Sequence, residues 1–173
     1  MNRLIIDYDK CVGCEMCVMR CSLDKTGMVN PAHARIHIVR HEEEGIMMPA
    51  ACRHCDEPRC LAVCPVNAIS KDGATGLLHI DAETCIGCKL CVEACLYGGP
   101  TDVPREGRKA KQSARIKVIC DLCGGKPACI EMCPTGAIQF TVLDEGAKKR
   151  QDEGVEKLAK LRAERLAVGA KKH

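Results

Sequence analysis

The chain has 173 residues, a formal net charge of +3 and only three aromatic side chains, two Tyr and one Phe. Its 46% hydrophobic share includes 16 cysteines, so a core of aliphatic side chains alone would be thin for this length. The composition therefore excludes an ordinary enzyme with an aliphatic core and requires disulfides or metal.

The expected cellular compartment indicates whether the cysteines form disulfides or bind metal. The N-terminal residues show no charged and then apolar leader and no twin-arginine pair, and no apolar run reaches the length of a membrane span. We expect a cytoplasmic protein without direct membrane insertion, with folded export on a signal-bearing partner left open. Dense cysteine in a reducing cytosol indicates metal binding or redox chemistry.

The cysteines form four groups of four, with no thiol left over. Their spacings are close to C-x2-C-x2-C-x3-C-P, the bacterial ferredoxin signature for [4Fe–4S] clusters. In chain order the groups are Cys11, Cys14, Cys17 and Cys21; Cys52, Cys55, Cys60 and Cys64; Cys85, Cys88, Cys91 and Cys95; Cys120, Cys123, Cys129 and Cys133. Gly13 and Gly87 stand where the backbone must bend tightly and where its N–H groups can face cluster sulfurs. Zinc, the competing interpretation, usually draws on two separated CxxC pairs.

The segment between groups one and two predicts a strand at Arg35–His41. A period of two places His33, His37 and His41 on one face of it. A solvated strand face is favoured over a three-histidine metal site. Glu42–Gly45 is expected to be an exposed turn.

Groups two and three resemble a complete two-cluster ferredoxin, because a short predicted hairpin joins them. The outer parts repeat this pattern: Leu4–Cys11 matches Leu78–Cys85, and Cys133–Ile138 matches Cys64–Ile69. We therefore predict that the N-terminal strand pairs with a strand at Ile138–Val142. Groups one and four would then form a second module, wrapped around the first.

This arrangement distributes the sixteen thiolates over four [4Fe–4S] clusters, with the fourth thiolate of each group binding the other cluster of a pair. The predicted ligand sets are Cys11, Cys14, Cys17 and Cys133; Cys120, Cys123, Cys129 and Cys21; Cys52, Cys55, Cys60 and Cys95; Cys85, Cys88, Cys91 and Cys64. Pairing of group one with two and of three with four is kept as an alternative.

The expected fold class is α+β, with two interlocked bacterial-ferredoxin-like modules and the clusters as their core. Residues 1–50 and 96–143 would form the outer module, 51–95 the inner module, and 144–173 a charged helical tail. An amphipathic helix is predicted at Asp152–Val168, and both a free tail and a partner-docking helix remain open.

Residues 98–119 are rich in basic side chains and are predicted to form a solvated loop, with a docking or cluster-tuning patch as the alternative. The basic residues are Arg105, Arg108, Lys109, Lys111, Arg115 and Lys117. Nucleic-acid binding is discounted, because no aromatic residues are interleaved with them.

Over about residues 3–142 the chain resembles the four-cluster electron-transfer subunits of molybdenum and tungsten oxidoreductases and of some hydrogenases. The short spacing from Cys123 to Cys129 and the stretch Val29–Ile36 are most similar to the iron–sulfur subunit of tungsten aldehyde oxidoreductases. The resemblance implies a relay of single electrons. Its partners would be a large catalytic subunit with a tungsto- or molybdopterin and a flavin subunit, ferredoxin or other acceptor.

The sequence contains no Ser/His/Asp set, no phosphate-cradling Gly-rich loop and no spare cysteine, so we expect no enzyme activity of the chain by itself. One alternative is a relay subunit of a hydrogenase, formate dehydrogenase or carbon-monoxide dehydrogenase system. An alternative of another class is a zinc-held structural or assembly module. Stacking of copies is also left open.

Overall fold

The computed structural model describes residues 2–104, 115–142, 144–149, 152–154, 156–157 and 160. Within them, short helices alternate with short strands. The elements are β1 Asn2–Ile6, η1 Tyr8–Lys10, α1 Met16–Thr26, η2 Pro31–His33, β2 Ile36–His41, η3 Glu42–Glu44, β3 Ile46–Ala51, α2 Arg59–Ala62, β4 Ile69–Lys71, β5 Leu78–Ile80, α3 Leu90–Glu93, β6 Thr101–Pro104, β7 Arg115–Val118, η4 Leu122–Gly125, α4 Ala128–Glu131 and β8 Ile138–Val142.

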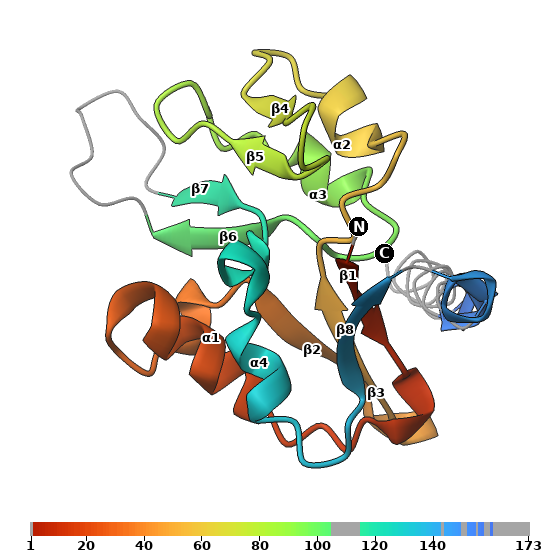
Figure 1. The fold of residues 1–173 in the computed structure, drawn as a ribbon. Coiled ribbons are helices and arrows are strands. Elements are labelled where there is room, and N and C mark those ends of the chain that lie inside the picture. The colour runs from red at the N-terminus through yellow and green to blue at the C-terminus, as the bar shows by residue number, and fades with distance from the viewer. Residues whose placement is uncertain are drawn as a thin grey trace, which may run out of the picture.

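The described strands form four separate two-stranded antiparallel sheets, β1–β8, β2–β3, β4–β5 and β6–β7 (Figure 1). The hairpin β4–β5 joins cysteine groups two and three, as predicted. The sheet β1–β8 joins segments far apart in sequence, with Ile6 opposite Ile138 and Asn2 opposite Val142. This pairing confirms the prediction drawn from the internal repeat. The mixture of short helices and small sheets is an α+β fold, as predicted.

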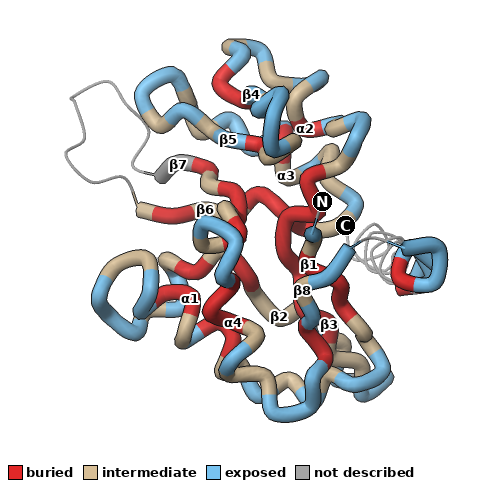
Figure 2. The backbone as a smooth tube through the Cα atoms, in the orientation of Figure 1, coloured by how far each residue is buried: buried red, intermediate tan, exposed pale blue. Residues whose placement is uncertain are grey.

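The core combines a few aliphatic side chains with cysteine sulfurs. Ile6 is fully buried, and Ile5 and Ile138 are nearly so. Seven cysteines belong to the main buried cluster, namely Cys17, Cys21, Cys52, Cys60, Cys91, Cys120 and Cys129. Figure 2 shows the buried residues gathered where the sheets and short helices meet, with the exposed loops at the periphery. The scarcity of aromatic residues is thus accompanied by a centre rich in thiols.

Helix α1 carries the second half of group one onto group four. It ends at Gly27, whose φ of 70° and N–H bond to the Leu23 carbonyl (2.8 Å) form a glycine C-cap. Cys17 and Cys21 are four residues apart, so they share one buried face of the helix. That face packs on α4, and Arg20 of α1 pairs with Glu131 of α4 at 3.5 Å.

The segment between groups one and two differs in part from expectation. The predicted strand is present as β2, and the turn at Glu42–Glu44 is present as η3. His33, however, lies in η2 before the strand, and His37 and His41 are half-buried. The strand β2 pairs with β3, which was not predicted. The solvated strand face is therefore wrong. Within the described residues, no three His, Cys, Asp or Glu side chains are placed to hold a single metal ion.

The predicted loop at 98–119 begins and ends as a hairpin, β6–β7. Lys117 is 3% exposed, so the prediction of a solvated loop is wrong at this residue. The basic residues Arg105, Arg108, Lys109 and Lys111 lie outside the described residues, as does most of the predicted helix at 152–168.

The described part of the C-terminal segment is helical at 145–149 and 152–154. It contacts the body of the protein, because Lys157 pairs with Asp9 at 2.8 Å and Ala147 is 1% exposed. No helix among the described residues has the length and apolar character needed to cross a bilayer.

Candidate functional site

Three cavities are each lined by four cysteines, and we number them by position along the molecule. Their volumes, including the part that opens to solvent, are about 300–330 Å³. Site 1 is lined by Cys11, Cys14, Cys17 and Cys133; site 2 by Cys21, Cys120, Cys123 and Cys129; site 4 by Cys64, Cys85, Cys88 and Cys91. Each cavity thus combines three cysteines of one group with one from a distant group.

The remaining four cysteines, Cys52, Cys55, Cys60 and Cys95, define site 3. Cys95 lies close enough to the other three for its charge to act on each of them. Cys95 belongs to group three and the others to group two, so the exchange of one thiol between groups recurs here. Every cysteine of the chain is a free thiol.

Buried cysteines of neighbouring sites lie close enough for the charge of one to act on the other. The charge of Cys17 of site 1 acts on Cys129 of site 2. The same relation links Cys120 of site 2 to Cys52 of site 3. A third pair, Cys60 and Cys91, links site 3 to site 4. These charge interactions link the sites in the order 1–2–3–4.

All four loops place the residue before the second cysteine in the left-handed region. Gly13 (φ 67°) and Gly87 (φ 73°) were expected to bend there. His54 (φ 49°) and Leu122 (φ 55°) occupy the equivalent positions of groups two and four and were missed. Only an alignment of the four CxxC loops with one another would have revealed them, because neither residue type signals a bend on its own.

His54 also ties its loop to the neighbouring hairpin. Its ring is buried, and its Nδ1 accepts a hydrogen bond from the Leu78 N–H of β5 (2.9 Å). Burial, with a smaller contribution from the charge of Arg3, lowers the pKa of His54 to about 4. The imidazole is therefore neutral at pH 7 and able to accept this bond.

Backbone N–H groups point at sulfur atoms in sites 1 to 4, as expected for loops that hold thiolates. Within the CxxC loops, Gly13 N–H faces Cys11 (3.5 Å) and His54 N–H faces Cys52 (3.4 Å). In groups one, two and three, the sulfur of the last cysteine accepts an N–H group from a residue further along the chain. These contacts are Arg35 to Cys21 (3.3 Å), Ala68 to Cys64 (3.3 Å) and Gly99 to Cys95 (3.2 Å).

The pKa values of the buried thiols favour the protonated form in the metal-free protein. Burial raises the pKa of Cys17 and of Cys120 to about 12, and that of Cys91 to about 11. At Cys133, burial acts upward, but N–H groups and the Thr135 hydroxyl hold the pKa below its ordinary value. A bound metal supplies the positive charge that deprotonates coordinating thiols, so metal loading releases protons here.

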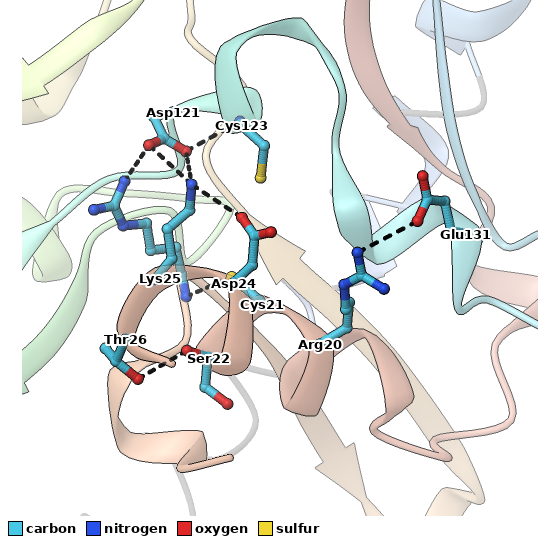
Figure 3. A network of polar contacts seen from close by, with 10 residues as sticks. Arg20, Cys21, Ser22, Asp24, Lys25, Thr26, Asp121, Cys123 and Glu131 are labelled. Carbon is cyan, nitrogen blue, oxygen red and sulfur yellow. Dashed lines mark hydrogen bonds and ion pairs between the residues drawn. The ribbon is translucent and has the colours of Figure 1, made fainter. Parts of the chain in front are cut away.

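An ionic network at site 2 fastens group one to group four (Figure 3). The Asp121 carboxylate accepts the Cys123 N–H (3.1 Å) and pairs with Lys25 at 3.0 Å and with Arg35 at 2.6 Å. Although burial acts to raise the pKa of Asp121, Lys25 and Arg35 hold it below its ordinary value. Lys25 comes from α1 and Arg35 from the residue directly before β2, so three segments meet at one carboxylate.

A buried guanidinium lies beside site 3. Arg53, next to Cys52, is 9% exposed and lies between the two tyrosines of the chain, 5.8 Å from the Tyr8 ring centre and 5.3 Å from that of Tyr97. It also donates a hydrogen bond to the Tyr8 hydroxyl. Tyr8 precedes group one and Tyr97 follows group three, so Arg53 links the turn before site 1 to the loop of site 3.

The donor set suits iron–sulfur clusters. Four thiols surround each site and N–H groups point at the sulfurs, and soft thiolates are the ligands that such clusters take. Residues 43–143 match the family described as 4Fe-4S dicluster domain, and residues 8–26 match the 4Fe-4S binding domain. The chain belongs to the 4Fe-4S dicluster domain family. This membership favours clusters over the zinc alternative.

The curated relatives of this chain include subunits of oxidoreductases and an electron transport protein. A polyferredoxin-like subunit of an aliphatic sulfonate oxidoreductase from Pyrococcus furiosus is 42% identical over 130 residues, which are 75% of this chain and 70% of that protein. The electron transport protein HydN of Escherichia coli is 36% identical over 156 residues, covering 80% and 87%. The beta subunit of the NADH-dependent phenylglyoxylate dehydrogenase of Aromatoleum evansii is 38% identical over 140 residues, covering 80% of this chain. This chain matches only 30% of that subunit's length.

Proposed function

We propose that the chain relays single electrons through four [4Fe–4S] clusters held at sites 1 to 4. The observation that carries the proposal is that the fold gathers the cysteines into four-cysteine sites, with the charge of a buried cysteine in one site acting on a cysteine of the next. Four thiolates per cluster leave no open iron position for substrate, and fully ligated clusters transfer electrons. The relatives' names support the same role.

The exchange of one cysteine between groups supports two interlocked modules. Sites 3 and 4 would belong to the inner module, residues 51–95, and sites 1 and 2 to the outer module, residues 1–50 and 96–143. The β1–β8 sheet and the contact of α1 with α4 join the two halves of the outer module. Residues 144–173 would be a separate tail on this body.

The partners would be a catalytic oxidoreductase subunit at one end of the row and an electron acceptor or donor at the other. The relatives that are named as subunits of a sulfonate oxidoreductase and of a phenylglyoxylate dehydrogenase support a catalytic partner. A pterin-bearing catalytic subunit, with tungsten aldehyde oxidoreductase as the first choice, and a flavin subunit or ferredoxin as the acceptor remain our proposal. Purification of the native complex under anaerobic conditions and identification of its largest chain test this choice.

Pairs of cysteine variants test the ligand sets. Wild-type protein, purified anaerobically, should contain about sixteen irons per chain. Cys21→Ala with Cys123→Ala removes two ligands of the same cluster, so about four irons should be lost. Cys17→Ala with Cys21→Ala removes ligands of two different clusters, so about eight should be lost.

The opposite pattern would contradict the exchange of ligands between groups, because clusters built within single groups lose about four irons when Cys17 and Cys21 are both replaced. The relay itself is tested by electron paramagnetic resonance of the reduced protein. A colourless protein that contains zinc, with no cluster signal on reduction, would refute it in favour of a structural module.

A further inference from the structure

Site 4 has a buried cation that its own lining does not neutralise. Lys117 of β7 is 3% exposed and lines the cavity together with the four cysteines of site 4. Its Nζ lies 2.8 Å from Oδ1 of Asp102, the residue directly opposite on β6. Asp102 is 30% exposed on its side chain and is not among the residues that line the cavity. The charge of Lys117 acts on Cys91 of this site, and its carboxylate partner does not line the cavity.

The charged side chains that line the other two cavities are paired within the lining or exposed to solvent. At site 2, Lys25 and Arg35 line the cavity, but Asp121 lines it with them and pairs with both. At site 1, the charged lining residue is Glu15, which is over a third exposed and is paired with Arg40 at 2.7 Å. Of these three cavities, site 4 has the buried charge without a counter-charge in its wall.

We propose that Lys117 raises the reduction potential of the cluster at site 4. The proposal depends on the proposed function, because it requires a cluster at site 4. The step concerned is the gain of one electron by that cluster from a reduced neighbour, with no bond or proton transferred. Lys117 keeps its charge and favours the state with one more electron, since charge near a cluster sets its potential.

The magnitude follows from burial. In the interior, charges interact with an effective dielectric well below that of water, whereas charges in contact with solvent are screened. Removing the Lys117 charge should shift the one-electron equilibrium of site 4 about tenfold, which equals 59 mV for a one-electron couple.

The chain offers a matched control at the same cavity. Lys89 also lines site 4 but is exposed, so Lys89→Met removes an equal charge from solvent. In anaerobic potentiometric titrations of the holoprotein followed by electron paramagnetic resonance, Lys117→Met should lower one midpoint by about 59 mV. Lys89→Met should lower it far less, and Lys117→Arg should restore most of the wild-type value.

A second variant moves the potential in the opposite direction. Asp102→Asn leaves the Lys117 charge without its carboxylate partner, so the same midpoint potential should rise. If Lys117→Met does not retain its iron, this variant alone tests whether the Lys117 charge raises the potential of site 4. The proposal is overturned if Lys117→Met and Lys89→Met have equal effects, or if Asp102→Asn leaves the midpoint unchanged or lowers it. A wild-type protein without clusters would instead refute the proposed function.

Discussion

A single methyl group at Gly99 should damage site 3. Gly99 is buried, and its N–H points at Cys95. A Cβ at this position would lie 2.9 Å from the Cα of Cys52 and 3.2 Å from its Cβ, where carbon atoms prefer about 3.5–4.0 Å. Because the nearest atom is backbone, the loop of Cys52 must move by roughly 0.6 Å, and overpacking of this kind costs about 1–3 kcal/mol.

Site 3 contains both Cys52 and Cys95, so the cost of Gly99→Ala should appear as loss of one cluster. If unfolding of the loop relieves the strain, 1–3 kcal/mol corresponds to cluster loss that is about 5- to 150-fold faster. The assay is the bleaching of the cluster absorbance in mild denaturant, with iron content measured in parallel. Gly73→Ala is the control, because Gly73 has open space around its Cβ position and no positive φ. Equal bleaching rates for the two variants would refute the steric argument.

Three further predictions concern the body of the protein. Asp121→Asn should lower the free energy of unfolding by about 1 kcal/mol, since the amide oxygen still accepts the Cys123 N–H but pairs weakly with two partly exposed cations. Asp121→Ala should lower it by about 2 kcal/mol, since the side chain that accepts the Cys123 N–H at the N-terminus of η4 is lost as well. Denaturant midpoints that match the wild type would contradict this. Ile6→Ala should cost about 2–5 kcal/mol because Ile6 is fully buried in β1, while Val142→Ala at the exposed end of the same sheet should be nearly neutral in the same measurement. Anaerobic removal of iron by a chelator should unfold the chain, because cysteines form much of its core, and an unchanged far-ultraviolet circular dichroism spectrum would show that the protein holds its fold without metal.

The cysteine spacing and the internal repeat together predicted which cysteines the fold brings close to one another. In the ferredoxin signature the first three cysteines of a group share one cluster, and the fourth binds the other cluster of the pair. The three cavities combine cysteines in this expected way. The β1–β8 pairing was predictable for the same reason, because the outer segments repeat the pattern of the inner hairpin. The ligation of metal at these sites and the module boundaries stay predictions.

The unpredicted features depend on tertiary contacts. Strand β3 contains Pro49, which argues against a strand in a large sheet but is tolerated in a two-stranded one, where each strand has a free edge. The left-handed conformation of His54 and Leu122 follows from their place in the loop and not from their residue type. The burial of Lys117 depends on the pairing of β7 with β6, and a basic segment gives no local sign of it.

The pairing of β1 with β8 has a consequence for biosynthesis. A ribosome adds about 5–20 residues per second, so the nascent β1 waits on the order of ten seconds for its partner. The hairpin β4–β5 closes within a few residues, and the last cysteine of sites 3 and 4 is Cys95, whereas site 1 lacks Cys133 until translation is nearly finished. Delivery of iron and sulfide during synthesis should therefore begin in the middle of the polypeptide and finish at its extremities.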